Sequence, residues 1–480
     1  MKPSVINKFL KAASLFSFFL ISSSYNYASV SLPVLRVDYP ASDLVYDYYI
    51  DGTMILEDTD GTVIESPVKL KTRGATALLY KMKPSFNMKL ETPDGEELDN
   101  TLLGLRKASS WILDAMAIDR ICMRNRVCFD IWNEYSKLPY DTDFDSRNGT
   151  VGKFVIVYMN DEYKGIYCLS DKINRKLLDL KKPKEEGEDV TIRGVLYKNG
   201  TQDISNQETV GFYNDFMVYV AEWHDAWELK EPDNYPGIPA WQPLIDYYEN
   251  RNQLYIEENF DVNNLIDYSL LVMALCIKDN WGNKNKYFSM RNYVGDKDDR
   301  KFVVTPWDLD TSLGGHYNGD YYDGQYSVWT MQQIANSSDY PFSICFTNPD
   351  VWTNMKQRWA QIRETALSVE SVANRMYEYC ELFEESGAWQ QYVDYWNTKA
   401  DRPKYVSDLR KEIDLIVEWY ADRFNSMDEY FDIKADNSVS SISDHEYISP
   451  VYNLQGLRID SRNLVRGQIY IHDGKKFIAK

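Results

Sequence analysis

Over much of the N-terminal third, hydrophobic and polar residues alternate in short runs, and this pattern predicts strands. In the clearest run, Pro84, Phe86, Met88 and Leu90 form an apolar face, and the residues between them are polar. A period of two is expected where one face of a strand is buried. Asp-Gly pairs, which favour tight turns, interrupt the pattern. The predicted strands are 33–38, 48–57, 68–72 and 83–90, with turns at 51–52 and 60–61.

Further along the chain, two stretches predict β-hairpins and longer periodic segments predict helices. The hairpins pair 153–160 with 163–170, and 287–291 with 301–305. Hydrophobic residues at helical spacing predict helices over 111–135, 212–227, 243–259 and 262–277. From 327 to 432, helix signals alternate with aromatic, acidic linkers, so we expect an all-α block there.

These elements predict an α+β protein with one two-lobed unit and a small appendage, which 480 residues can accommodate. The C-terminal appendage is too small to build much core alone. The expected parts are a β-rich lobe with a helix (29–180), a second lobe (181–326), a helical extension (327–434) and a C-terminal segment of short strands (435–480).

The first 28 residues have the layout of a secretory signal peptide. Lys2, Lys8 and Lys11 form a basic start, 12–21 is an apolar stretch too short to span a bilayer, and Ala28 precedes the expected cut. A buried first helix is the alternative. Cleavage would remove three lysines and change the formal charge from −20 to −23 (−20 − 3). No other segment has the length and apolarity of a transmembrane helix.

The net charge of −20 narrows the function classes. It argues against non-specific nucleic-acid binding and against an anionic membrane surface as partner. A phosphate donor would therefore need a locally basic pocket or a metal ion. The cysteines are expected to be buried thiols, with an exported disulfide as the alternative. They lie without metal-ligand spacing at positions 122, 128, 168, 276, 345 and 380.

Two acidic residues form the strongest candidate for chemistry. Asp308 and Asp310 follow the predicted strand 301–305 and precede a Gly-Gly turn. On an extended backbone their carboxylates would point to the same side, about 7 Å apart at the Cα atoms. Such oxygen ligands suit Mg²⁺ that bridges phosphate oxygens. The alternative is a solvated acidic loop.

A second stretch, 278–286, adds Asp279 and the carboxamides of Asn280, Asn283 and Asn285. An acid-plus-amide loop upstream of a metal-binding acid is the order found in kinase-type phosphoryl transfer. Zinc hydrolysis has little support because the four histidines lie far apart, and the sequence has neither Gly-x-Ser-x-Gly nor a Gly-rich phosphate loop. A glycosidase, which needs two carboxylates across a cleft, stays open.

Five sequence blocks, taken in their order, resemble the spore-coat protein H (CotH) kinase family. The resemblance extends from about residue 32 to 314 and implies an atypical protein-kinase-like fold with a β-rich N-lobe and a helical C-lobe. The blocks are Arg73-Gly74 with 83–90, then 103–105 with 111–113 and 119–125, then 158–167, the loop 279–285, and the Trp-Asp-x-Asp segment 306–314.

This resemblance implies ATP-dependent phosphate transfer to an exported protein, with ATP and Mg²⁺ as cofactors. Arg73 and Lys83 would bind the nucleotide, with Lys89 as the other candidate for the phosphate lysine. Asp171, at the end of the first hairpin, would pair that lysine, although the family usually has the longer Glu there.

By the same resemblance, Asp279 would be the catalytic acid, and Asn285 would bind the metal together with Asp308 and Asp310. The family's step from this Asp to this Asn is five residues, whereas here it is six. Either the loop has one extra residue, or Asn280 replaces the catalytic acid and activity is weak or absent.

The last segment resembles the secretion-associated terminal domain of Bacteroidetes proteins, through Tyr-Asn-Leu-Gln-Gly at 452–456 and Gly-x-Ile-Tyr-Ile at 467–471. This resemblance implies a secreted, periplasmic or cell-surface protein with export machinery as a partner. A plain β appendage is the alternative.

The sequence therefore predicts an exported kinase that transfers the γ-phosphate of ATP to Ser or Thr of a protein substrate. The alternative is a surface structural or binding protein that keeps the kinase-like scaffold without transfer. The charge of −23 after cleavage, the six-residue spacing and Asp171 motivate this alternative.

Overall fold

The computed structural model divides the chain into two compact units, Met1–Phe431 and Asp432–Lys480. In the first unit it describes residues 31–40, 48–73, 83–142, 145–199, 227–235, 237–280, 285–316, 341–399 and 405–431. In the second it describes residues 432–433 and four short strands between 451 and 478. The predicted signal peptide, Asn283 and residues 212–226 of the predicted helix 212–227 lie outside the described residues, and the last residue of that helix, Trp227, begins a strand instead.

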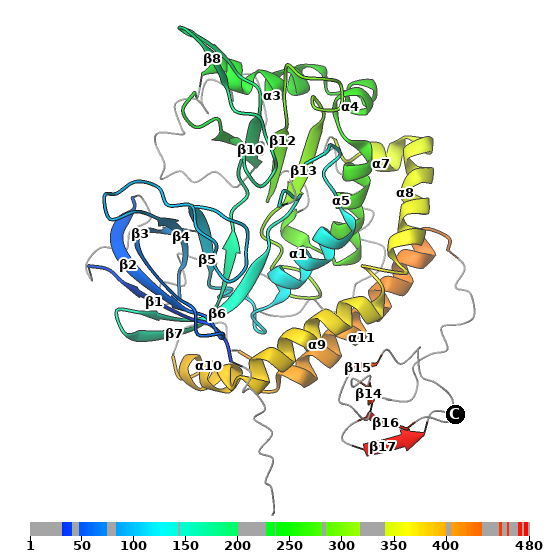
Figure 1. Cartoon of the computed structure of the whole chain (residues 1–480). Coiled ribbons are helices and arrows are strands. Elements are labelled where there is room, and N and C mark those ends of the chain that lie inside the picture. The colour runs from blue at the N-terminus through cyan, green and yellow to red at the C-terminus, as the bar shows by residue number, and fades with distance from the viewer. Residues whose placement is uncertain are drawn as a thin grey trace, which may run out of the picture. The chain divides into compact units, whose positions relative to one another are not determined.

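Seven strands near the N-terminus form a closed barrel (Figure 1). Their order is β1-β2-β3-β4-β5-β7-β6. Neighbouring strands are antiparallel except for β1 and β6, which close the barrel as a parallel pair. The strands are β1 (Val34–Asp38), β2 (Ile50–Glu57), β3 (Val63–Arg73), β4 (Ser85–Leu90), β5 (Ser110–Asp114), β6 (Gly152–Met159) and β7 (Glu162–Asp171).

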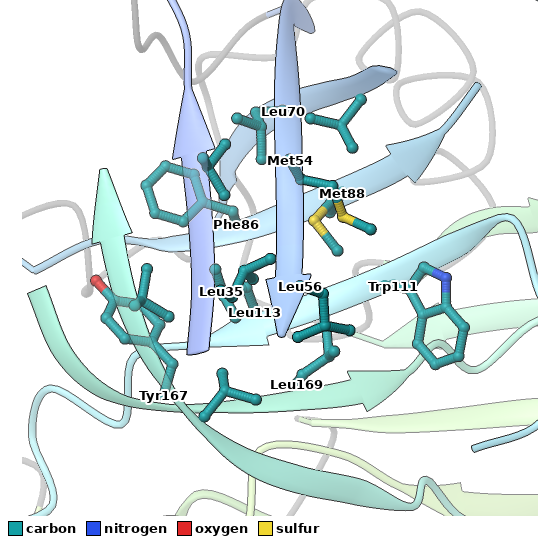
Figure 2. Close-up of a cluster of buried hydrophobic side chains, with 14 of the residues drawn as sticks. Leu35, Met54, Leu56, Leu70, Phe86, Met88, Trp111, Leu113, Tyr167 and Leu169 are labelled. Carbon is teal, nitrogen blue, oxygen red and sulfur yellow. The ribbon is translucent and has the colours of Figure 1, made fainter. Parts of the chain in front are cut away.

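The inward-facing residues of these strands build the hydrophobic core of the barrel (Figure 2). Phe86, Met88 and Leu90 of β4 are fully buried, which confirms the alternation seen in the sequence. Trp111 of β5 and Leu169 of β7 join them in the same core. Each large apolar side chain buried in this way stabilises the fold by about 1.5–3 kcal/mol. This core therefore holds the strands of the barrel, and the residues at their ends, in place.

A second, four-stranded sheet has the order β11-β10-β12-β13. Its antiparallel pair β12–β13 confirms the second predicted hairpin. Helix α5 (Val262–Ala274) is fixed to β13 by Asn264, whose side chain exchanges hydrogen bonds of 2.6 and 3.0 Å with the backbone of Val304. The first turn of α5 is therefore held against the middle of β13. The strands are β10 (Val195–Asn199), β11 (Trp227–Glu231), β12 (Lys286–Met290) and β13 (Phe302–Pro306).

Helices account for the regular structure described between 341 and 431, as predicted. Helix α9 packs against α1 and α11, and α10 packs against β7 of the barrel (Figure 1). Trp396 at the end of α10 donates a 3.1 Å hydrogen bond from Nε1 to the carbonyl of Lys164 in β7. These helices are α1 (Arg124–Tyr135), α7 (Ile344–Thr347), α8 (Pro349–Ile362), α9 (Val369–Glu385), α10 (Ala388–Trp396) and α11 (Leu409–Tyr430).

The remaining elements of the first unit are a small hairpin and two helices. Strands β8 (Lys184–Glu186) and β9 (Asp189–Thr191) pair with each other, and α3 (Ile238–Asn250) and α4 (Gln253–Asn259) precede α5. None of the described helices has the length and apolarity needed to cross a membrane. All six cysteines are described, and each is a buried free thiol, so the predicted thiols are confirmed and no disulfide joins them.

Two local predictions are wrong. The predicted helix 111–135 begins only at Arg124, because Trp111 and its neighbours form β5, a strand buried on both faces that therefore lacks the alternating pattern. The predicted turn at Asp51-Gly52 lies inside β2. A Cβ on Gly52 would lie 2.7 Å from the carbonyl oxygen of Asp38, so the glycine permits close approach of β1 and does not make a turn.

The α+β class is confirmed, and the strands of the N-terminal region form a closed barrel, which the two-lobed description did not include; the two-lobed arrangement stays a prediction. The second unit contains a four-stranded sheet of order β15-β14-β16-β17, built from β14 (Val451–Asn453), β15 (Arg458–Ile459), β16 (Ile469–His472) and β17 (Lys475–Ile478).

Candidate functional site

The two acid-bearing stretches lie side by side because backbone and amide hydrogen bonds join them. Asn280, in the short 3₁₀ helix Lys278–Asn280 after α5, donates from Nδ2 to the carbonyls of Asn285 and Trp307, each at 2.9 Å. The N–H of Trp307 donates to the same Asn285 carbonyl at 3.0 Å. Asn280 is only 2% exposed, so its side chain holds the two loops together and cannot reach a substrate.

Asp279, the residue before Asn280, in contrast has a partly exposed side chain. Its N–H donates to the Thr311 hydroxyl at 3.4 Å, which ties it to the loop that carries Asp310. Asn285 donates from its side chain to the Asp279 carbonyl at 3.4 Å. Of the two residues that could stand at the position of the catalytic acid, Asp279 is therefore the one whose side chain is accessible.

The backbone at Asp308 is not extended, contrary to expectation. Its φ is +59°, in the left-handed region, and Asn285 has a φ of +51°. Asp and Asn tolerate this region better than other non-glycine residues, but it still costs free energy. The hydrogen bonds between Asn285, Asn280 and Trp307 hold the conformation in place. The relative position of Asp308 and Asp310 is therefore set by this turn and not by a strand.

The carboxylates of this region repel one another. Burial, then the charges of Asp308, Asp114, Asp119 and Asp279, raise the pKa of Asp310 well above its usual value. Burial also raises the pKa of Asp308, as do Asp114 and Asp279, although Arg73 opposes the shift. The Asp308 side chain is nevertheless exposed to solvent, which screens part of this effect. A bound cation would relieve the repulsion.

Asn125, at the start of α1, connects the acid loop to the barrel. Its Nδ2 donates to Oδ2 of Asp114 at 2.9 Å, and its Oδ1 accepts the N–H of Leu309 at 3.1 Å. Leu309 lies between the two acids and is fully buried. The sequence reasoning did not select Asp114 or Asn125 as site residues. The only signal was that Asn125 ends one of the family-like blocks.

Replacing Asn125 by Ala is expected to lower the free energy of unfolding by about 1–3 kcal/mol, because the buried N–H of Leu309 and the carboxylate of Asp114 both lose a partner. Urea denaturation measures this change. Asn259→Ala, which removes only a 2.9 Å bond to the Tyr255 carbonyl within one helix, is the matched control. Equal, small effects in the two variants would contradict a connecting role for Asn125.

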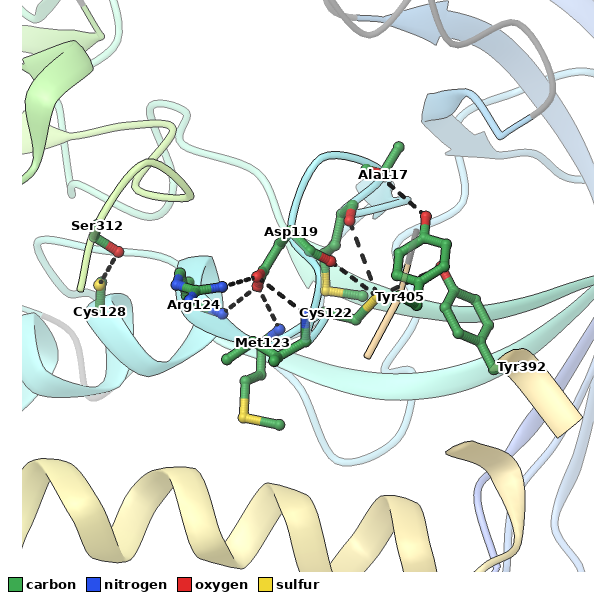
Figure 3. A network of polar contacts seen from close by, with 11 residues as sticks. Ala117, Asp119, Cys122, Met123, Arg124, Cys128, Ser312, Tyr392 and Tyr405 are labelled. Carbon is green, nitrogen blue, oxygen red and sulfur yellow. Dashed lines mark hydrogen bonds and ion pairs between the residues drawn. The ribbon is translucent and has the colours of Figure 1, made fainter. Parts of the chain in front are cut away.

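A second set of contacts fixes the start of α1 (Figure 3). Asp119 is buried and accepts the N–H groups of Met123 and Arg124 at 2.8 and 2.7 Å, and it also forms an ion pair with the Arg124 guanidinium. One turn further along α1, the Cys128 thiol lies 3.1 Å from the hydroxyl of Ser312, two residues after Asp310. Helix α1 is thus attached to the acid loop at two points, Asn125 and Cys128.

Of the three cations predicted to bind nucleotide, Arg73 is the one that reaches the acid loops. Its guanidinium lies 4.8 Å from the ring of Trp307, next to Asp308. Lys89 is half-buried on β4, with Nζ 5.0 Å from the ring of Tyr49.

Lys83 is buried just before β4, in a cage formed by the barrel and α10. Its Nζ donates to the carbonyls of Ala115 and Ile166, the latter at 2.9 Å, and to the hydroxyl of Tyr392. The rings of Tyr167 and Tyr392 lie 4.8 and 4.5 Å from Nζ. The three ammonium hydrogens are all used in this way. Lys83 therefore attaches the helical region to the barrel.

Asp171 ends β7 and is 1% exposed. Its Oδ1 accepts the N–H of Val151 at 2.8 Å, and its Oδ2 lies 3.5 Å from Nε of Arg106. Burial raises the pKa of Asp171, whereas Arg106 and the Val151 N–H lower it. The structure does not bring Lys83 and Asp171 together as a pair.

The oxygen-bearing side chains of the acid loops fit a metal ion that is bound partly by the protein and partly by a substrate. Within the described residues, no three His, Cys, Asp or Glu side chains converge closely enough to enclose an ion by themselves. Mg²⁺ commonly keeps several waters and uses one or two carboxylates together with substrate phosphates. Asp308 and Asp310, whose mutual repulsion a cation would relieve, suit such binding, and Asn285 offers an amide beside them.

The protein has a mixed α+β fold with a closed barrel, and its two acidic loops are joined by hydrogen bonds. It therefore belongs to the class of proteins in which the fold brings carboxylates from separate elements to one place. A family model described as CotH kinase protein matches residues 70–427, more than half of the chain, and the protein belongs to this family. The resemblance seen in the sequence motifs is thereby confirmed. No curated protein matches the chain. The Bacteroidetes-type tail lies outside the matched range and stays a prediction.

Proposed function

We propose that this protein is an exported atypical kinase that transfers the γ-phosphate of ATP to a Ser or Thr hydroxyl of a protein, with Mg²⁺. Membership of the CotH kinase family supports a kinase-like function. The observation that carries the proposal is the junction of the two loops through Asn280, because it assembles the accessible Asp279 with Asp308 and Asp310.

In this proposal Asp279 accepts the proton of the acceptor hydroxyl. The hydroxyl oxygen forms a bond to the γ-phosphorus, the bond from the γ-phosphorus to the β–γ bridging oxygen breaks, and ADP leaves with that oxygen. Asp308, Asp310 and Asn285 would hold Mg²⁺, which when bound neutralises charge on the phosphates. Arg73, stacked on Trp307, would contact the nucleotide.

Export is part of the proposal on sequence grounds alone. The signal-peptide pattern of residues 1–28 supports delivery out of the cytoplasm, and the secretion-domain-like tail supports a secreted, periplasmic or cell-surface location reached through export machinery. A two-lobed kinase-like arrangement, with the barrel as the N-lobe, belongs to the same proposal.

A second candidate function is a kinase-like surface structural or binding protein without transfer. One observation favours it: Lys83 is enclosed by Tyr392 and two carbonyls, and Asp171 pairs with Arg106, so the family's lysine–acid pair is not made. In such a protein the two joined loops would stabilise the fold and would take no part in catalysis.

Stabilisation of the full chain by ATP and Mg²⁺ separates the two candidates. A ligand at 100 times its dissociation constant raises the free energy of unfolding by about 2.7 kcal/mol. We expect a rise of this order at millimolar ATP with Mg²⁺ and a smaller one with ATP alone, measured by denaturant unfolding. An unchanged unfolding curve at millimolar Mg²⁺ and ATP would favour the scaffold candidate.

A further inference from the structure

A cavity of about 330 Å³ lies where helices α1 and α9 meet the start of β6. Pockets of about 300–1,000 Å³ are typical of small-molecule sites, so this one has room for a small ligand. Asn125 and Cys128, which attach α1 to the acid loop, lie on a different face of that helix from the residues that line the cavity. The cavity is therefore separate from the acid loops. It is lined by Asp130, Asn133, Val151, Arg375, Glu378 and Tyr379.

The charges around the cavity are largely balanced within the protein. Oδ1 of Asp130 accepts a 2.9 Å hydrogen bond from Nε of Arg126, which is a buried residue. On the side of α9, the guanidinium of Arg375 forms an ion pair with Glu134. Glu378 is an exposed residue, so water screens its charge. A neutral, polar ligand therefore fits this lining better than an ion does.

Two of the lining side chains carry a buried polar atom that has no hydrogen-bond partner among the described residues. These atoms are Oδ1 of Asn133, an acceptor, and Nε of Arg375, a donor. Nδ2 of Asn133 already donates to the carbonyl of Thr150 at 2.8 Å, which fixes the carboxamide. Buried polar atoms almost always have a partner, so a fitting ligand donates one hydrogen bond and accepts another. A hydroxyl group can do both.

Tyr379 and Val151 add an apolar part to the lining. The Tyr379 ring is held in place, because its hydroxyl donates to Oδ2 of Asp130 at 2.5 Å and its ring meets that of Phe154 edge-on at 4.9 Å between centroids. The cavity therefore combines apolar surface with carboxylate, amide and guanidinium groups. A sugar ring has the matching chemistry, since it offers C–H groups on its faces and hydroxyl groups around its edge.

We propose that this cavity binds one sugar unit, with Arg375 and Glu378 as the side chains that hold its hydroxyl groups. Neighbouring hydroxyls can accept from the guanidinium and donate to the carboxylate, because a guanidinium only donates and a carboxylate only accepts. A free monosaccharide and the end of a glycan chain present the same hydroxyls, so both are sources of this ligand. The inference goes beyond the proposed function, because binding of a sugar here requires neither ATP nor phosphate transfer.

Titration of the full chain with simple sugars, followed by saturation-transfer NMR, tests the site. The probes are the methyl glycosides of glucose, galactose and mannose, and N-acetylglucosamine. L-Serine, a small polar zwitterion, is the probe for a charged ligand. We expect at least one of the sugars to bind with a dissociation constant of about 1–10 mM, as is usual for so small a polar ligand, and L-serine not to bind.

Arg375→Met and Glu378→Ala should each weaken the binding of that sugar at least about 10-fold, since each removes a charged hydrogen-bonding partner. Arg410→Met is the matched control. Like Arg375, Arg410 forms an ion pair with a glutamate, here Glu384 at 3.1 Å, but it does not line the cavity. This control should leave the affinity unchanged. Thermal unfolding of each variant shows that the fold is kept.

A trisaccharide of the bound sugar distinguishes the two sources. Binding at least as tight as that of the methyl glycoside supports a glycan chain as the ligand, and exclusion of the trisaccharide supports a free monosaccharide. Failure of all four sugars to bind, binding of L-serine in their place, or equal sugar affinity in the parent and in both folded variants overturns the site. None of these outcomes depends on phosphate transfer from ATP, so the proposed function is tested separately.

Discussion

Replacing Asp308 or Asp310 by Asn is expected to reduce Mg²⁺-dependent phosphate transfer from ATP at least about 1000-fold. A metal ion that neutralises phosphate charge lowers the barrier by several kcal/mol, and about 4 kcal/mol corresponds to a factor of about 1000. Each substitution keeps the size of the side chain but removes a charged oxygen ligand. Transfer of labelled γ-phosphate to the protein itself or to a co-expressed partner measures the loss.

Asp161→Asn is the matched control for these variants. Asp161 is an exposed aspartate in the turn between β6 and β7, and its φ of +62° places it in the same left-handed region as Asp308. Any effect of Asn on this backbone conformation would therefore be seen in the control as well. Full activity in both acid-pair variants, against an active parent, would mean that neither carboxylate binds the metal.

The second large effect is on stability. Replacing Lys83 by Met is expected to lower the free energy of unfolding by about 3 kcal/mol. The carbonyls of Ala115 and Ile166 and the hydroxyl of Tyr392 lose their donor inside the protein, and each unsatisfied buried group costs about 1–3 kcal/mol. Removal of a buried charge offsets part of this cost. Denaturant unfolding measures the difference.

The effect of Lys83→Met on the free energy of unfolding should depend on pH. Burial lowers the pKa of Lys83 from 10.5 to about 8. Between these values the unfolded chain binds more protons at this residue than the folded chain, so stability rises with pH across this window. The stability of the parent relative to Lys83→Met should therefore increase as the pH is raised from about 8 toward 10.5.

Lys89→Met is the control for both measurements, since Lys89 lies on β4, the strand that Lys83 precedes, and is only half-buried, with a ring contact to Tyr49. It should change stability little. If Lys83→Met instead kept the stability of the parent and lost the stabilisation by ATP and Mg²⁺, Lys83 would be the phosphate lysine that the sequence resemblance implied.

Local patterns in the sequence predicted those elements whose two faces differ in environment. The strand with Phe86, Met88 and Leu90 and the two hairpins have one apolar face or a clear turn, and the structure contains them. For the segment at Trp111 the sequence wrongly predicts a helix, because a strand buried on both faces has no alternation. The closed barrel depends on the parallel pairing of β1 with β6, which no local pattern encodes.

The acid loops were visible in the sequence because each carries its residues within a few positions. The partners of those loops were not, because they come from distant elements. Asn125 is 184 positions from Leu309, and Lys198 reaches Trp307 from another strand of the second sheet. Lys83 fitted the expected motif, but whether a lysine faces a ligand or a cage of tyrosines is decided by α10, which is more than 300 residues away.

Binding of Mn²⁺, a paramagnetic substitute for Mg²⁺, in the presence of a non-hydrolysable ATP analogue tests the central claim most directly. The parent should bind one Mn²⁺ per nucleotide, detected by electron paramagnetic resonance, and the double variant Asp308→Asn, Asp310→Asn should bind it at least about 100-fold more weakly, in keeping with the loss of two charged ligands. Equal Mn²⁺ binding by the parent and the double variant would contradict the claim that these two acids hold the metal.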